Sequence, residues 1–277
     1  GTTDDDYYGD LDDLRVTEDE IEYLLQGAER YLPGIRQARM IRAWVGIRPT
    51  LYQWGKNEDA LSRDHKVFDH KKEDGVGGII SIAGGKLASY RLMSEEASDL
   101  ICQKLGIDAR CQTHLIPLPG GEREVKAEEL AERYGVPAYA VHRMIYRHGA
   151  RSEEILELTR ERAELKEMVC FCEPVLACEL VYCIKKEWAR SLTQLRNRTR
   201  LGTGPCQGMR CALKACAVLA RELDMSAREA EEELVNFLER RWRGNRPVLE
   251  GKTLEQEELN QAGYFLVGNL HRLLAGK

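Results

Sequence analysis

The chain has 277 residues, of which 43% are hydrophobic and 31% are charged, and its formal net charge at pH 7 is −5. This composition excludes a fibrous or wholly disordered protein, and the charge balance excludes a chain-wide basic field that attracts nucleic acid. No apolar run approaches the roughly 18–20 residues that a membrane span requires. The length predicts one large or two modest domains.

The first part of the chain combines helical and strand-like segments. A helix is predicted over 17–31, because Thr17 and Glu20 form a capping-box pattern ahead of apolar residues on one face. Strands are predicted over 39–47 and 75–83, where the residues are apolar and partly β-branched. We therefore expect a small mixed sheet with helices here.

Beyond the second strand the apolar periodicity becomes helical. From Leu87 apolar residues recur at spacings of three, four and seven until Gly106, which predicts a helix. The segment 111–124 carries two prolines and two glycines, which is typical of a linker. The remainder predicts helices over 125–134, 137–147, 152–166, 174–186, 211–223, 227–241 and about 254–274. The fold class is thus predicted to be α+β, with a mostly α-helical second half.

Cysteines are numerous and unevenly placed. Seven of the nine fall within residues 170–216, and an odd number argues against a disulfide framework. The acidic opening GTTDDDYYGDLDD does not resemble a secretory signal peptide. We expect a reducing, cytoplasmic compartment in which cysteines bind metal. The chain begins with Gly rather than Met, so we interpret it as a fragment or a processed product.

Two cysteine pairs form the sharpest motif. Cys170 and Cys172 are two residues apart, so an extended backbone turns both thiols to one side. Cys206 lies in the glycine- and proline-rich loop 204–208, and Cys211 lies near the start of the next helix. Backbone N–H groups at a helix start favour thiolates over thiols. Two pairs on two loops are what a four-thiolate metal cluster requires.

The pattern favours a [2Fe–2S] cluster over zinc. Structural zinc usually takes C-x(2–4)-C pairs, whereas this chain pairs CxC with a distant CxxxxC. The stretch 190–211 has no acidic residue, and its arginines would stabilise a reduced cluster. Zinc and uncoordinated core thiols are the alternatives, and small apolar core positions are predicted for the other cysteines. The arginines of this stretch are Arg190, Arg196, Arg198, Arg200 and Arg210. The cysteines predicted at core positions are Cys102, Cys111, Cys178, Cys183 and Cys216.

The segments 169–184 (VCFCEPVLACELVYCI) and 191–211 (SLTQLRNRTRLGTGPCQGMRC) resemble the bacterioferritin-associated-ferredoxin-like [2Fe–2S] domain. The match is greatest to the version that ends the A subunits of anaerobic glycerol-3-phosphate dehydrogenases. The resemblance implies that a [2Fe–2S] cluster is held by Cys170, Cys172, Cys206 and Cys211.

The first ninety residues are similar to the second half of the flavin- and substrate-binding domain of FAD-dependent glycerol-3-phosphate dehydrogenases. The matching motifs are GTTD (1–4), VGIRP (45–49), SRD (62–64) and GGKLASYR (84–91). No strand–GxGxxG–helix unit occurs, so we expect the FAD pyrophosphate site to lie upstream of Gly1. The chain alone is expected to bind FAD poorly and to be inactive.

The chemistry of these motifs suits a phosphorylated polyol and a flat cofactor. Arginines beside a proline or in a polar turn are candidates for bidentate phosphate contacts, and paired glycines permit close backbone approach at a helix start. The resemblance implies a catalytic and substrate-binding set of Arg48, Arg63 and Lys86. It also implies that the backbone of Gly84, Gly85, Lys86 and Leu87 lies against the flavin.

The resemblance predicts four regions. These are a partial FAD and substrate domain (1–110), a linker with helices (111–167), the [2Fe–2S] domain (168–225) and a helical tail (226–277). The helix 227–241, with Leu234, Phe237 and Leu238, is either a lid over the cluster domain or a surface for a partner.

The expected activity is oxidation of sn-glycerol 3-phosphate to dihydroxyacetone phosphate by FAD. Electrons would pass singly through the cluster to partner subunits and the quinone pool. Membrane contact at the inner face of the cell membrane would come only through those partners, and no nucleic acid is expected. The alternatives are another FAD-dependent amine or hydroxyacid dehydrogenase with the same cluster domain, and a non-catalytic zinc or thiol interaction module.

Overall fold

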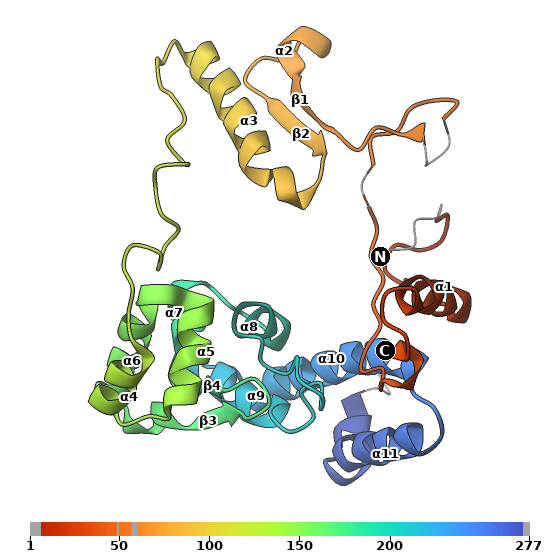
Figure 1. The fold of residues 1–277 in the computed structure, drawn as a ribbon, viewed down its shortest axis with the longest axis vertical. Coiled ribbons are helices and arrows are strands. Elements are labelled where there is room, and N and C mark those ends of the chain that lie inside the picture. The colour runs from red at the N-terminus through yellow and green to blue at the C-terminus, as the bar shows by residue number, and fades with distance from the viewer. Residues whose placement is uncertain (1–6, 49, 57–59, 274–277) are drawn as a thin grey trace. The chain divides into compact units, whose positions relative to one another are not determined.

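The computed structural model describes residues 7–48, 50–56 and 60–273 (Figure 1). The chain forms two compact units, one of Gly1–Leu32 with Val45–Pro117 and the other of Pro33–Trp44 with Leu118–Lys277. Helices dominate, and the described strands form two antiparallel ribbons of two strands each. The predicted α+β fold class is confirmed.

The first unit contains α1 (Glu18–Glu29) and a ribbon covered by one long helix. Strand β1 (His65–Asp69) pairs antiparallel with β2 (Ile80–Gly84), and the short α2 (His70–Glu73) lies between them. The long α3 (Tyr90–Leu105) packs against both strands. The predicted capping box of Thr17 and Glu20 is confirmed, as is the end of α3 at Gly106, which is left-handed with φ 69°.

Apolar burial in the first unit is sparse. Among its described residues Ala97 is the single buried apolar residue, whereas Tyr8, Trp54 and Leu87 are about nine-tenths exposed, at 92%, 90% and 89%. A sheet normally buries one face against another layer of the same domain. The described part of this unit therefore lacks a core of its own, which is what we expect of a partial domain.

The second unit holds the hydrophobic core. Its strands β3 (Met168–Cys170) and β4 (Val175–Leu176) form a short antiparallel ribbon with a bulge, next to the central helix α7. Every residue of α7 from Ala177 to Ile184 is buried. The helices are α4 (Ala127–Tyr134), α5 (Ala138–His148), α6 (Ser152–Glu161), α7 (Ala177–Lys186), α8 (Leu192–Thr199), α9 (Ala212–Glu222), α10 (Ala227–Asn245) and α11 (Gly251–Ala262).

A buried ion pair ties α5 to α7. The guanidinium of Arg147 donates to both carboxylate oxygens of Glu179, at 2.6 and 2.7 Å, and His148 Nε2 lies 3.1 Å from the same carboxylate. Glu179 is completely buried, and Arg147 also donates to the carbonyl of Pro174. This network fixes the helix that follows the first cysteine pair.

Two strand predictions were wrong in part. The segment 39–47 forms no strand; instead Ala43 N–H donates to the carbonyl of Gly244 in α10, because no neighbouring strand offers it a ladder. The second predicted strand begins only at Ile80, since Gly75 and Gly78 adopt positive φ in a turn. The sequence patterns also missed β1 and α8.

The C-terminal helix is interrupted. The predicted segment 254–274 is α11 followed by a π-helical turn, Gly263–Val267, and a 3-10 helix, Leu270–Leu273. Leu274, Pro49 and the GTTD motif lie outside the described residues. No described helix is long and apolar enough to cross a membrane.

Candidate functional site

The four predicted cluster cysteines converge in the second unit. Cys170 ends β3 and is buried, Cys172 is exposed in the turn that follows, Cys206 lies half-buried in the loop after α8, and Cys211 is the buried N-cap of α9. Their thiols meet across the two segments. Cys172 Sγ lies 3.8 Å from Cys206 Sγ, and Cys170 and Cys211 line the same cavity.

All four cysteines line one cavity of about 250 Å³. The other lining residues are Val169, Phe171, Arg210 and Lys214. The lining therefore contains sulfur and cationic groups without a carboxylate. This is the donor set that sequence reasoning predicted, delivered by two segments that lie 34 positions apart at Cys172 and Cys206.

Glycines allow the two segments to approach. A Cβ at Gly204 would lie 2.4 Å from Cys172 Cβ, closer than real Cβ contacts. Gly208 has φ 90°, and a Cβ there would lie 2.7 Å from the ring of Phe237. The glycines thus permit both the left-handed backbone and the close packing of the cysteine loop.

Helix α10 forms the back of the loop. Leu234, Phe237 and Leu238 are buried, and the Phe237 ring packs on Gly202 and Gly208. Of the two interpretations of this helix, a lid over the cysteine domain is therefore the one its apolar face fits, because that face is covered within the chain.

Buried polar contacts hold the loop in place. Gln207, at φ 48°, donates to the carbonyls of Thr203 and Gly204 and accepts 2.8 Å from Arg196. Arg241 donates to the carbonyl of Cys206 at 3.3 Å, and Tyr264 donates to that of Met209 at 2.7 Å. Sequence reasoning missed Gln207, Arg241 and Tyr264, since no spacing rule links α10 or the C-terminal turn to this loop.

The thiols and Arg196, which contacts the loop, have shifted pKa values. A hydrogen bond from the Cys211 thiol lowers the pKa of Cys170 to about 6, and the same bond raises the pKa of Cys211. Burial raises the pKa of Cys172, with a further contribution from Cys206. Burial, reinforced by the charge of Arg42, lowers the pKa of Arg196 to about 10.

The arginines of 190–211 do not all face the cysteines. Arg210 lines the cavity and Arg196 holds Gln207, as a cluster-facing role requires. Arg198 instead donates to carbonyls on α8 and before it, and Arg200 pairs with Glu173. That the arginines of this stretch stabilise a reduced cluster stays a prediction.

The remaining cysteines divide by unit. Cys178, Cys183 and Cys216 are buried, as predicted, and burial raises the pKa of each thiol, that of Cys216 to about 11. Cys102 and Cys111 are only half-buried, so the core role expected for them was wrong. Both thiols remain partly accessible beside the cavity between α3 and the segment that follows it.

The four cysteines are the type of residue that a four-thiolate cluster requires, but they are not arranged as a complete metal site. Within residues 7–48, 50–56 and 60–273 there is no group of three or more Cys, His, Asp or Glu side chains placed to hold a metal ion. Soft thiolates without carboxylate or imidazole suit iron–sulfur clusters or zinc. The cavity supplies four such donors.

Arg63 and the Gly84–Lys86 segment lie at one end of the β1–β2 ribbon. His65 opposes Gly84 in the register, so Arg63 and the Gly84–Lys86 turn lie at the same end. A Cβ at Gly84 would lie 2.7 Å from the carbonyl oxygen of Asp64 and 3.2 Å from the side chain of Leu51, which brings the segment after Arg48 to this end as well.

The side chains at this end are open to solvent. Arg48, Arg63, Lys86 and Leu87 are exposed, and Gly84 and Gly85 have φ of 75° and 84°. Lys86 precedes a single 3-10 turn, Leu87–Ser89, and α3 itself begins only at Tyr90. The helix start that was expected at Leu87 therefore lies three residues later.

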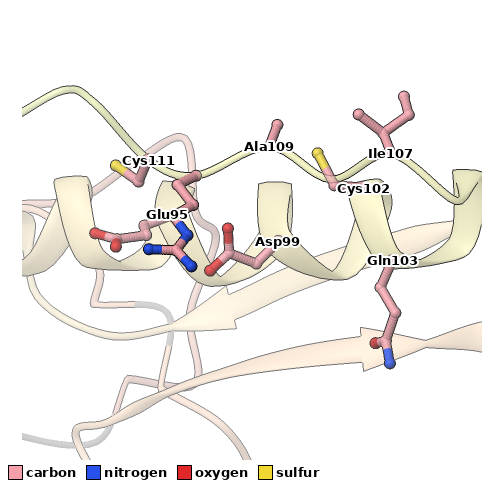
Figure 2. Close-up of a pocket in the computed structure, with 8 residues that line it drawn as sticks. Glu95, Asp99, Cys102, Gln103, Ile107, Ala109 and Cys111 are labelled. Atoms are coloured by element: carbon pink, nitrogen blue, oxygen red, sulfur yellow. The ribbon is translucent and has the colours of Figure 1, made fainter.

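A second cavity lies in the first unit, and none of the predicted site residues lines it. It measures about 470 Å³ and lies between α3 and the segment that follows it (Figure 2). Figure 2 shows Glu95, Asp99 and Cys102 on the helix and Ile107, Ala109 and Cys111 on the returning chain. Cys102 and Cys111 lie toward opposite ends of it.

The chain is similar to known families and proteins. Residues 1–91 match the family of FAD dependent oxidoreductases, and residues 111–230 match the C-terminal domain of alpha-glycerophosphate oxidase. The chain is 36% identical over 268 residues to the A subunit of the anaerobic glycerol-3-phosphate dehydrogenase of Haemophilus influenzae, covering 95% of this chain and 46% of that protein. The protein of the same name from Escherichia coli K12 is 36% identical over 261 residues, covering 93% and 47%.

The chain is homologous to the A subunits of anaerobic glycerol-3-phosphate dehydrogenases. It spans about half the length of these relatives. A glycerol-3-phosphate dehydrogenase of Synechocystis is 34% identical over 208 residues, covering 73% of this chain and 37% of that protein. The fold also resembles the crystal structure of a glycerol-3-phosphate dehydrogenase from Bacillus halodurans complexed with FAD, with a TM-score of 0.64, 21% identity and coverage of 89% of this chain and 49% of that one.

Proposed function

We propose that this chain is part of an FAD-dependent dehydrogenase that oxidises sn-glycerol 3-phosphate to dihydroxyacetone phosphate and passes the electrons through a [2Fe–2S] cluster. The observation that carries the proposal is the convergence of Cys170, Cys172, Cys206 and Cys211 on one cavity. The names of the relatives support the substrate and the flavin. A bound cluster supplies a one-electron relay.

At the proposed substrate site the chain contributes cationic side chains and glycine backbone that a ligand can approach. Arg48 and Arg63 hold the phosphate, because guanidinium groups donate in pairs to phosphate oxygens. Lys86 supplies an ammonium beside Gly84 and Gly85, where the absence of a side chain lets a flat ring approach. FAD, when bound, supplies the acceptor for the hydride from C2, and the hydroxyl proton leaves to a base or to water.

At the cluster end the chain offers an exit for electrons. Phe171, between the two cysteines of the first pair, is 68% exposed, and the Lys214 ammonium lies 5.9 Å from the centre of its ring. Cys172 is also exposed. Partner subunits receive the electrons at this surface and pass them to quinone, and they provide the contact with the inner face of the membrane.

An anaerobic titration of the complete flavoprotein with sn-glycerol 3-phosphate tests this function. The flavin absorption should bleach and the electron paramagnetic resonance (EPR) signal of a reduced cluster should appear. In Cys206→Ser the bleaching should remain while the signal is lost, and in the control Cys111→Ser both should remain. Bleaching by an amine or an unphosphorylated hydroxyacid, but not by glycerol 3-phosphate, would contradict the substrate and favour another dehydrogenase of this type.

A further inference from the structure

Three arginines from distant parts of the chain gather behind the cysteine loop. Arg196 on α8 donates to Gln207, and Arg241 on α10 donates to the carbonyl of Cys206. Arg42 lies against Gly244 of α10, where a Cβ would fall 2.8 Å from its guanidinium, and it reaches the carbonyl of Arg240 at 3.5 Å. All three belong to the second unit, although Arg42 lies 198 positions before Arg240.

Positive charge in this group exceeds the negative charge that faces it. Arg241 is 3% exposed and forms a bidentate pair with Glu257, which is itself buried. Among the described residues no carboxylate pairs with Arg42 or Arg196, and Arg42 Nη1 is buried without a hydrogen-bond partner. Three guanidinium groups against one carboxylate leave two positive charges.

Arg241 is buried and Arg42 and Arg196 are half-buried, so this excess of positive charge is partly withdrawn from water. Buried charges are normally paired, because an ion that leaves water without a counter-charge is costly. Arg196 and Arg241 donate to Gln207 and Cys206 of the loop, and the four cysteines line the cavity beside that loop, with thiols that are neutral when protonated. An oxidised four-thiolate [2Fe–2S] unit carries about two negative charges and gains one on reduction. Its charge therefore matches the unpaired charge of the arginines.

We propose that Arg42, Arg196 and Arg241 are the counter-charge of the cluster and raise its reduction potential. The inference rests on the proposed [2Fe–2S] function and assigns to the loop's supporting residues a role in tuning it. These are positioning residues, since they act on the cluster through space and through the loop backbone. The segment 33–44 docks on α10 and does not pair in a sheet. This docking places the Arg42 cation beside the other two arginines.

A potentiometric titration of the full chain, followed by EPR, tests the inference. Removing one positive charge in Arg196→Gln or Arg42→Gln should make one-electron reduction about tenfold less favourable, a shift of about 59 mV to lower potential. Arg196→Lys keeps the charge and should restore most of the potential. Arg228→Gln removes an exposed arginine of α10, whose side chain is 81% exposed, and should leave the potential unchanged.

The outcomes separate this inference from the function it rests on. A wild-type chain that takes up no iron would overturn the proposed function and this inference together. Loaded Arg42→Gln and Arg196→Gln chains with wild-type potentials would overturn the inference alone. An equal shift in Arg196→Lys and Arg196→Gln would also overturn it, because the shift would then come from the lost guanidinium geometry. Arg42 donates nothing to the loop, so its variant remains informative if Arg196→Gln fails to load.

Discussion

Cys172 Sγ and Cys206 Sγ lie 3.8 Å apart across two segments of the chain. This separation is far above the roughly 2.0 Å of a disulfide, so both are thiols that face one cavity. Gly204 makes the approach possible, since the loop passes Cys172 without a side chain at that position. The two halves of the proposed cluster site thus depend on a backbone contact as much as on the cysteines.

The first prediction concerns this contact. In Gly204→Ala the new Cβ would stand 2.4 Å from Cys172 Cβ, so the loop must move away. We expect the iron content per chain to fall by more than half and the fold to lose about 1–3 kcal/mol, as overpacking typically costs. Gly263→Ala is the control, because nothing lies within 4 Å of that position. Full iron loading in Gly204→Ala would contradict the importance of the contact.

The buried pair of Arg147 and Glu179 should be essential for the helical unit. Glu179→Gln leaves the Arg147 guanidinium buried without its counter-charge, which typically costs about 3–5 kcal/mol. Denaturant unfolding measures the loss. Glu255→Gln breaks an exposed pair with Lys252 and should change stability by less than about 0.5 kcal/mol. Similar small effects for both variants would show that the network is not structural.

Stability should fall in acid through Glu222. Burial opposes ionisation of this carboxyl, but hydrogen bonds from Arg162 and Lys185 outweigh it and hold its pKa below the ordinary 4.5. At pH values above its pKa in the unfolded chain, such a carboxylate stabilises the fold. This stabilisation is lost as the pH falls through the pKa of the carboxyl in the folded protein.

Glu222→Gln should therefore unfold at a lower Tm at neutral pH, by about 2–4 °C for a loss of about 1 kcal/mol. The difference from wild type should disappear as the pH drops below 4.5. The exposed Glu258→Gln serves as control. A Tm difference that persists unchanged in acid would indicate that the effect is steric rather than electrostatic.

Phosphate recognition is predicted to depend on Arg48. In the complete flavoprotein, Arg48→Ala should lower kcat/KM for glycerol 3-phosphate by about 10–150-fold, the equivalent of about 1.5–3 kcal/mol for hydrogen bonds to a charged group. Activity toward unphosphorylated glycerol should not change. Lys72→Ala removes a cation from α2 and should affect neither. Equal losses with both substrates would assign Arg48 a structural role.

Local sequence patterns were sufficient to predict most helices of the second half of the chain. The prolines, glycines and apolar periods around Ala138, Ala227 and Gly106 act within a few residues, and the structure places helix boundaries close to them. The convergence of the cysteines followed from the CxC and CxxxxC spacing. Segments whose partners lie far away in sequence were harder to predict.

Long-range contacts account for the errors. Nothing near residues 39–44 indicates that this part of the apolar run docks on α10, where the N–H of Ala43 donates to the carbonyl of Gly244. Likewise, the arginines around Arg198 form an acid-free run in sequence, but the turn of α8 directs them to different partners. The roles of Arg42 and Arg241 depend on tertiary packing that no local period encodes.

Metal and sulfide analysis of anaerobically purified chain, with EPR after dithionite reduction, tests the central claim most directly. We expect about two irons and two sulfides per chain, and a reduced-state signal that disappears in Cys206→Ser but persists in Cys111→Ser. Stoichiometric zinc, or no metal after anaerobic reconstitution, would contradict the electron relay and leave the four thiols as a structural or interaction site.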